Sequence, residues 1–228
     1  PWFKSALQDP NAPIADYFNF HQHPDEYESW LGVRSLPKLN YRSQNLRDTV
    51  YAGPNAIFRY WLKAPYAVDG WRVDVANMLA RHGKDQLEAE VWAGIRQAVK
   101  EENPSAYLLG ENFFDSSEQL QGDRLDASMN YFGFANPIGY WLNCFEVNQH
   151  AEPRNVKSKV TWSTQALVDS WQASRAAIPW VIARQQFNLL GSHDTPRFIN
   201  VLDHDQTRNR LAVAFLLTYV GVPCIYYG

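Results

Sequence analysis

Residues 69–75 have the sequence DGWRVDV, which predicts a short β-strand ending in an acidic residue. A helix is expected next over residues 85–102, because apolar residues recur at four-residue spacing from Leu87 to Val99. Asn103-Pro104 stops that helix, and residues 106–111 form a second apolar strand that also ends in an acid. A strand, a helix and another apolar strand indicate parallel β/α units that are buried on both faces.

The pattern continues toward the C-terminus. Short strands are expected at residues 127–131, 187–190 and 224–227, and helices at residues 163–177 and 206–219. The apolar run 211–222 is shorter than the roughly 20 residues of a membrane span and predicts a core helix. Five strands are visible, whereas a closed (β/α)₈ barrel of eight strands takes about 250 residues. If the strands belong to a barrel, the chain therefore holds only part of it.

The N-terminal side has a different character. Residues 1–44 hold turn signals at Asp9-Pro10-Asn11 and His23-Pro24-Asp25 but no sustained helical period, so we expect a loop-rich excursion. Helices are expected at residues 45–51 and 55–63, separated by Gly53-Pro54. We therefore predict two parts: residues 1–44 as the excursion and residues 45–228 as the β/α part, which is a partial barrel if its strands belong to one.

Composition excludes several classes of protein. With 46% apolar and 20% charged residues, the 228-residue chain can bury a core, and a net charge of −3 gives no footprint for nucleic acid or an anionic membrane. Two cysteines, Cys144 and Cys224, are too few for a disulfide framework. The first residues do not form a signal peptide, and since no initiator Met is present we expect an excerpt of a longer chain. No phosphate-cradling loop, nucleophile elbow or dinucleotide fingerprint occurs, so no cofactor is expected.

Strand alternation places Arg72 and Asp74 on one face of their strand, with Val73 and Val75 on the other. At ~3.3 Å per residue the two side chains start about 6.6 Å apart. Arg72 can then hold the carboxylate of Asp74 ionised and oriented through charge-assisted hydrogen bonds. The alternative is a structural ion pair that only satisfies itself.

Two further acids stand at predicted strand ends. Glu111 precedes aromatic residues, and a carboxyl group beside aromatic surface is desolvated, which raises its pKa and suits it to proton donation. Asp194 lies in a polar segment, His193 to Arg197, after an apolar strand. The alternatives are that Glu111 caps the next helical turn and that Asp194 caps a helix begun by Pro196. Two carboxylates ~5–5.5 Å apart suffice for a retaining glycosidase, as nucleophile and acid/base.

These residues resemble the α-amylase superfamily, glycoside hydrolase family 13. The segments that carry the resemblance are GWRVDVAN (70–77), LGEN (109–112), SHD (192–194) and GVPCIYYG (221–228). They are similar to the family's motifs at barrel strands 4, 5, 7 and 8. LPKLN (36–40) and the stretch 122–131 resemble the neopullulanase, cyclomaltodextrinase and maltodextrin-glucosidase branch. The resemblance implies a (β/α)₈ TIM barrel, incomplete here, from the excursion after strand 3 to strand 8.

The resemblance also implies roles for individual residues. Asp74 is expected as nucleophile, Glu111 as acid/base and Asp194 as the third catalytic acid. The substrate-binding residues are expected to be Arg72, His193, Asn77, Phe113 and Arg197. The implied reaction is retaining hydrolysis of α-1,4-glucosidic bonds, with α-1,6 bonds as a further substrate, in maltooligosaccharides. The implied location is cytoplasmic, and a homodimer is compatible with the resemblance.

Two other functions are compatible with the same residues. A glucanotransferase would use the same intermediate with a sugar as acceptor, and a sugar-binding segment would bind without turnover. His21, His23, Asp25 and Glu26 include metal-ligand types, but a solvated loop is favoured and no metal is expected. Asp205 is expected to cap the following helix. Trp30, Tyr41 and Phe113 suit either stacking on sugar rings or ordinary packing.

Overall fold

The computed structural model describes residues 2–142 and 161–227. Cys144 lies outside the described residues, and Cys224 is a free thiol. Contacts divide the chain into two units. Unit 1 comprises residues 1–71 and 78–107, and unit 2 comprises residues 72–77 and 108–228.

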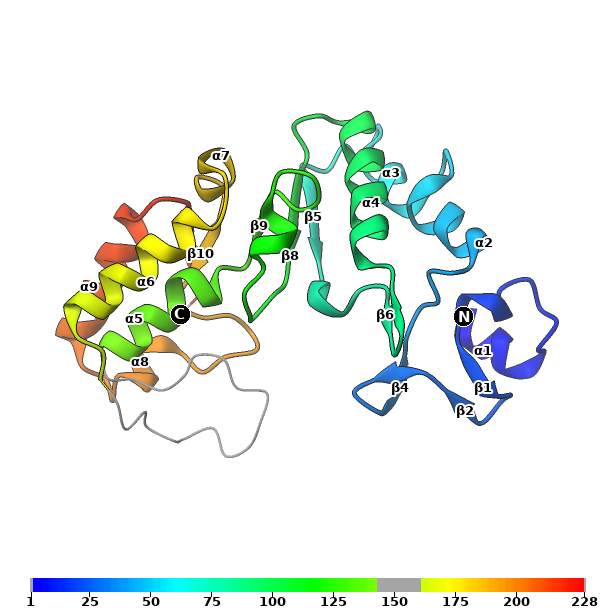
Figure 1. Cartoon of the computed structure of the whole chain (residues 1–228), viewed down its shortest axis with the longest axis horizontal. Helices are drawn as coiled ribbons and strands as arrows, with labels where there is room; N and C mark the ends of the chain where they lie inside the picture. The colour runs from blue at the N-terminus through cyan, green and yellow to red at the C-terminus, as the bar shows by residue number, and fades with distance from the viewer. Residues whose placement is uncertain (1, 143–160, 228) are drawn as a thin grey trace. The chain divides into compact units, whose positions relative to one another are not determined.

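The strands of the predicted β/α units follow one another in sequence order and pair in parallel (Figure 1). Its members are β5 (Gly70–Val73), β8 (Tyr107–Gly110), β9 (Ala127–Ser128), β10 (Phe187–Leu189) and β11 (Val222–Cys224). The order β5-β8-β9 forms one sheet, a parallel bridge between Met129 and Phe187 continues it to β10, and β11 pairs in parallel with β10. Each strand lies beside the next one along the chain, which is the winding of a barrel.

The long amphipathic helix of unit 1, α4 (Glu88–Glu102), packs against the helical residues 48–52 and 57–60. Val91, Trp92, Ile95 and Val99 are fully buried on one face of α4, which follows the predicted four-residue spacing. The other helical elements of this unit are α1 (Trp2–Gln8), η1 (Ala15–Tyr17), α2 (Gln44–Arg47), a π-helical turn η2 (Asp48–Ala52) and α3 (Ile57–Tyr60). Its short strands are β1 (Phe20–Gln22), β2 (Glu26–Tyr27), β3 (Ser29–Trp30), β4 (Val33–Pro37), β6 (Arg81–His82) and β7 (Asp85–Gln86).

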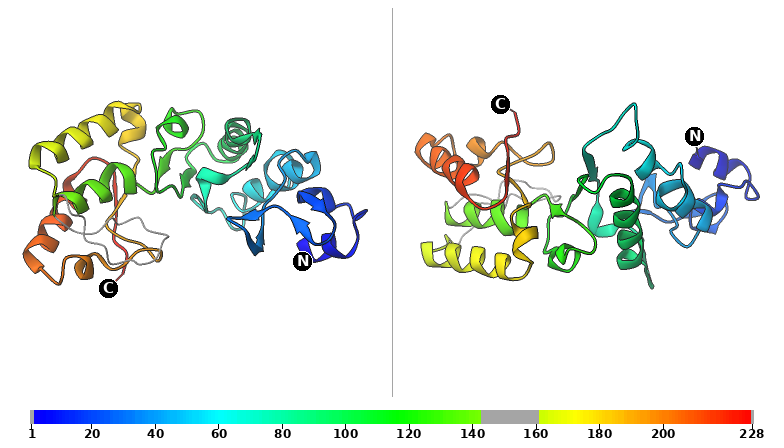
Figure 2. Two further views of the ribbon diagram at one scale, coloured as in Figure 1. Left: turned by 60° about the horizontal axis from the view of Figure 1, so that its bottom comes forward. Right: turned by 90° about the horizontal axis from the view of Figure 1, so that it is seen from above.

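Unit 2 contains an aromatic core between helices. Figures 1 and 2 show α5 (Asn136–Trp141), α6 (Thr164–Ala176) and α9 (Gln206–Thr218) side by side. The Trp171 ring packs edge-to-face on Phe215, with ring centroids 5.2 Å apart, and the Phe134 ring stacks on Trp171. The remaining elements are η3 (Ala76–Met78), which straddles both units, η4 (Ser117–Leu120), a π-helical turn η5 (Tyr131–Ala135), α7 (Trp180–Ala183) and α8 (Phe198–Val201).

Some predicted boundaries are wrong, for local reasons. The helix predicted over 85–102 begins at Glu88, because residues 85–86 pair with Arg81–His82 as a hairpin. The strand predicted over 127–131 ends at Ser128, and Tyr131 already begins a π-helical turn. The core helix predicted over 211–222 ends at Thr218 with only Ala212 and Leu216 buried, and the last strand begins at Val222.

Two further predicted elements differ. The helix predicted over 55–63 is a single turn, Ile57–Tyr60, and the N-terminal excursion contains an unpredicted helix, Trp2–Gln8. Asp205 caps α9 as predicted, since its carboxylate accepts hydrogen bonds from the N–H groups of Thr207 and Arg208.

Candidate active site

The predicted acids lie at the carboxyl ends of neighbouring strands. Asp74 directly follows β5, and Glu111 directly follows β8. The Glu111 N–H donates to the Val73 carbonyl at 2.9 Å, which aligns the two strand ends. Gly110 makes the close approach of η3 possible, because a Cβ there would lie 3.0 Å from the Ala76 Cβ and 2.7 Å from the Leu125 Cδ1.

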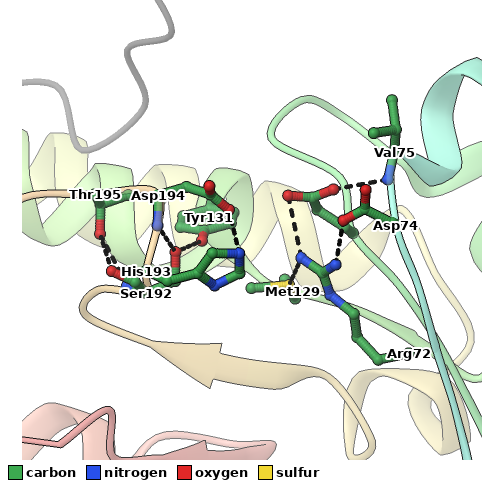
Figure 3. Close-up of polar contacts among 10 residues, drawn as sticks. Arg72, Asp74, Val75, Met129, Tyr131, Ser192, His193, Asp194 and Thr195 are labelled. Carbon is green, nitrogen blue, oxygen red and sulfur yellow. Dashed lines mark hydrogen bonds and ion pairs between the residues drawn. The ribbon is translucent and has the colours of Figure 1, made fainter. Parts of the chain in front are cut away.

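Arg72 links both acids (Figure 3). Its Nη1 donates to the Asp74 carboxylate, and its Nη2 lies 3.1 Å from Glu111 Oε1. The same Nη2 lies 3.5 Å from the Met129 sulfur. Arg72 and Asp74 therefore do not form an isolated structural ion pair, because the same guanidinium also orients the carboxyl group of Glu111.

The two acids differ in their surroundings. The Asp74 side chain is 74% exposed, whereas that of Glu111 is 7% exposed. Burial raises the pKa of Glu111 above its ordinary value, and the negative charges of Asp74 and Asp194 act in the same direction. The Val75 N–H and the Arg72 guanidinium oppose the rise in pKa without cancelling it. A buried acid with a raised pKa beside an accessible carboxylate is the division of labour that acid-assisted nucleophilic chemistry needs.

Val75 has a strained backbone at this point. Its φ of +46° lies in the left-handed region, which a β-branched residue rarely adopts. The predicted alternation therefore holds through Asp74 but is wrong at Val75, where the strand has ended. In this conformation the Val75 N–H donates to Glu111 Oε2 at 2.7 Å, so the strain serves to orient the buried acid.

The third acid lies on a tight turn after β10. Asp194 Oδ2 lies 3.2 Å from His193 Nε2, and the Ser192 hydroxyl accepts a hydrogen bond from the Asp194 N–H (Figure 3). Asp194 does not cap a helix, because α8 begins only at Phe198 with Arg197 as the residue before it. Glu111 does not cap a helical turn either, because the next one, η4, begins at Ser117.

The other predicted site residues are placed differently from one another. Asn77 lies half-buried in η3. Phe113 is 7% exposed and stacks on Tyr131, so it offers a substrate little ring surface. The Arg197 guanidinium lies over the rings of Tyr226 and Tyr227, with its central carbon 5.1 and 4.3 Å from their centroids.

Other sequence candidates lie outside this site. Tyr41 is buried, which favours the packing interpretation of its ring. His23 Nε2 contacts the Ala6 carbonyl oxygen at 2.7 Å, and His21 Nε2 contacts Glu28 Oε1 at 2.8 Å. Across residues 2–142 and 161–227, no three His, Cys, Asp or Glu side chains cluster as metal ligands would. In the same residues, no helix is long and apolar enough to cross a membrane.

Sequence reasoning missed three residues that shape the site. Met129 contacts Arg72, and Tyr131 and Ser192 hydrogen-bond to each other beside Asp194 (Figure 3). Met129 and Tyr131 belong to a stretch that the sequence marks only as similar to one branch of the family. The sequence does place both residues at the end of the predicted strand 127–131, between the strands of Glu111 and Asp194. That position could have indicated that they lie near the site.

The parallel strand order and the Arg-bridged acids define the class of β/α-barrel proteins with a two-carboxylate site at the strand ends. The chain belongs to the alpha-amylase family, whose sequence profile, described as "Alpha amylase, catalytic domain", matches residues 2–228. The predicted family is thereby confirmed, and with it the (β/α)₈ TIM-barrel fold as the fold class.

Individual relatives agree with this assignment. The chain is 33% identical to a cyclomaltodextrinase from a Bacillus species over 93% of its own length and 34% of the relative's. It is 29% identical to a maltogenic alpha-amylase from Bacillus acidopullulyticus, covering 96% of this chain and 33% of that one. A debranching enzyme from Nostoc punctiforme superposes with a TM-score of 0.83 at 30% identity, covering all of this chain and 46% of that structure. The chain thus spans about a third of the length of these curated relatives.

Proposed function

We propose that this chain carries the catalytic acids of a retaining glycoside hydrolase that cleaves α-1,4-glucosidic bonds, and also α-1,6 bonds, in maltooligosaccharides. One observation carries the proposal: Arg72 bridges an exposed carboxylate, Asp74, and a buried carboxyl group, Glu111, whose pKa burial raises. One guanidinium can hold two carboxyl groups at the separation of ~5–5.5 Å that retaining enzymes use.

In the first step the Asp74 carboxylate attacks the anomeric carbon. Protonated Glu111 gives its proton to the glycosidic oxygen as the bond between carbon and oxygen breaks, so the leaving sugar departs as a neutral alcohol. The product of this step is a glycosyl ester on Asp74. Arg72 keeps the attacking carboxylate oriented until it reacts.

In the second step Glu111, now a carboxylate, takes a proton from water. The oxygen of that water attacks the same carbon from the opposite face and releases Asp74. Two inversions give net retention of the α configuration. Asp194 and His193 are assigned to the sugar hydroxyls, and Asn77 and Arg197 to further substrate contacts.

The substrate class rests on the relatives. Cyclomaltodextrinase, maltogenic alpha-amylase and "Neopullulanase 2" from Thermoactinomyces vulgaris are names of proteins that act on α-glucans. The last is 30% identical to this chain over 99% of the chain's length. We extend this substrate class to the whole protein of which these strands form the site.

We also propose how the protein is organised. We assign residues 45–228 to barrel strands 4–8 with their helices, and residues 1–44 to the excursion after strand 3. A homodimer and an intracellular location are part of the proposal, and a relative from Bacillus subtilis, 30% identical, is named "Intracellular maltogenic amylase".

Proton NMR of the full-length protein acting on maltotriose tests the reaction. We expect the first-formed reducing sugar to be the α-anomer, before mutarotation. A β-anomer would contradict the retaining mechanism, and the absence of any product would contradict catalysis. Products longer than maltotriose would show that a sugar replaces water as the acceptor, which is the glucanotransferase alternative.

A further inference from the structure

Tyr131 occupies a central place in unit 2 that the proposed reaction does not yet use. It is fully buried, and its ring stacks on Phe113 with the centroids 4.4 Å apart and an angle of 15° between the planes. Phe113 follows Glu111 by two residues, so Tyr131 is packed against the segment that carries the buried acid. Close packing of its ring therefore holds Tyr131 in a fixed position.

The hydroxyl of Tyr131 reaches the turn that carries Asp194. It donates to Ser192 Oγ at 2.7 Å, and the same oxygen accepts the Asp194 N–H at 3.1 Å (Figure 3). The Ser192 N–H donates to Thr195 Oγ1 at 2.8 Å and so closes the turn. Ser192 is 6% exposed, so water has little access to replace either bond.

The two residues before Tyr131 contact Arg72 and strand β10. Met129 contacts Arg72 through its sulfur, whereas Asn130 hydrogen-bonds to Asn188 Oδ1 at 2.8 Å. Burial raises the pKa of Tyr131 to about 12, so its hydroxyl remains a neutral donor over the pH range of ordinary assays.

We propose that Tyr131 is a positioning residue for the reaction: through Ser192 its hydroxyl sets the place of Asp194 relative to the acids at the ends of β5 and β8. This inference rests on the proposed function, since it assigns Asp194 to the sugar. Tyr131 touches no reacting atom. Its contribution is the alignment of Asp194 with a sugar that distorts toward the transition state.

The variant Tyr131→Phe in the full-length protein tests the inference, because it removes the hydroxyl and keeps the stacked ring. A hydrogen bond of this kind contributes up to about tenfold in rate, so we expect kcat on maltotriose to fall roughly tenfold. KM should change less than about twofold, because the lost alignment matters most in the transition state. The pH at which activity declines should stay unchanged, since the phenol does not titrate there.

A matched control is Tyr219→Phe. The Tyr219 hydroxyl is buried and has no hydrogen-bond partner among the described residues, so its loss should leave kcat and KM as they are.

A second variant, Ser192→Ala, removes the acceptor of the hydrogen bond that the Tyr131 hydroxyl donates. It should reproduce the kinetic pattern of Tyr131→Phe without altering the aromatic packing.

A double-mutant cycle separates positioning from general packing. In an Asp194→Ala background, Tyr131→Phe should cost less than about twofold, because its effect acts through Asp194. The full tenfold loss in that background, or unchanged kcat in both Tyr131→Phe and Ser192→Ala, would overturn the inference while leaving the proposed function intact. Absence of maltotriose hydrolysis by the unaltered protein would overturn the proposed function, and this inference with it.

Discussion

Two arginines in this protein each bridge two acids, and the two clusters behave in opposite ways. Arg59, in unit 1, lies 2.6 Å from Glu101 Oε2 and 3.1 Å from Glu102 Oε1. Arg72, in unit 2, contacts Asp74 and Glu111. Hydrogen bonds from Arg59 and from Gln97 lower the pKa of Glu101, whereas burial raises the pKa of Glu111.

The two pKa shifts differ because the carboxyl groups differ in solvent exposure, not because of the arginine. Glu101 lies at the exposed end of α4 with 48% of its side chain accessible, so solvent and the cation both favour its charged form. Glu111 has lost its solvent, and the negative charges of Asp74 and Asp194 further disfavour its charged form. An arginine between two acids is therefore a mark of a reactive site only where one of the acids is desolvated.

Substituting the acids should change kcat/KM more than any other substitution, and only in the Arg72 cluster. Asp74→Asn and Glu111→Gln should each lower kcat/KM on maltotriose by at least about 10³-fold, since nucleophile and proton donor are lost. Glu101→Gln, the matched change in the other cluster, should leave kcat/KM unchanged. Circular dichroism checks that all three variants are folded. Undiminished hydrolysis by either site variant would refute the assigned roles.

A smaller effect separates the arginines. Arg72→Met should reduce kcat about 10²-fold, because it removes the cation that orients both acids. Arg59→Met should leave kcat unchanged and cost about 1–3 kcal/mol of stability, because the guanidinium is mostly buried and also donates to the Tyr51 carbonyl. Steady-state kinetics and thermal melts measure the two quantities. Equal loss of kcat in both variants would mean that the two clusters play the same role.

The pH dependence of activity should locate the acid. Activity requires protonated Glu111, so kcat should fall as pH rises through the raised pKa of Glu111. Because Arg72 lowers that pKa, the residual activity of Arg72→Met should decline at a higher pH than in the unaltered protein. A decline at lower pH in the variant would contradict the electrostatic role of Arg72.

The smallest effects are in stability, and their signs differ between the clusters. The raised folded-state pKa of Glu111 gives a stabilising contribution that is present below its unfolded pKa and is lost as pH rises through the folded value. The lowered pKa of Glu101 gives a contribution that is present above its unfolded pKa and is lost as pH falls through the folded value. In thermal melts across pH, Glu111→Gln should therefore weaken the loss of stability above the ordinary pKa of a carboxyl group, and Glu101→Gln should weaken the loss below it. The same change in both variants would contradict opposite pKa shifts of Glu111 and Glu101.

The sequence could predict the strands and the acids that follow them. Asp74 and Glu111 stand after apolar runs of the right length, and the chain itself shows that their strands are one β/α unit apart. The buried face of α4 follows from its four-residue spacing. These features are local, so a single sequence contains them.

The remaining features depend on contacts between distant segments. The left-handed backbone of Val75 goes against the preference of a β-branched residue, and it accompanies hydrogen bonds from the N–H groups of Val75 and Ala76 to Glu111, 36 and 35 positions further along the chain. The hairpin that delays the start of α4 and the short β9 are likewise set by pairing partners. Tyr131 and Ser192 are 61 residues apart, and no local pattern announces their hydrogen bond.

The most direct test is to trap the ester on Asp74. The Glu111→Gln variant of the full-length protein would be treated with α-maltosyl fluoride, whose leaving group needs no proton, and digested for mass spectrometry. We expect one added maltosyl unit, on the peptide that contains Asp74. A sugar attached to Asp194 or to any other residue, or a folded variant that releases fluoride without a glycosylated Asp74, would contradict it.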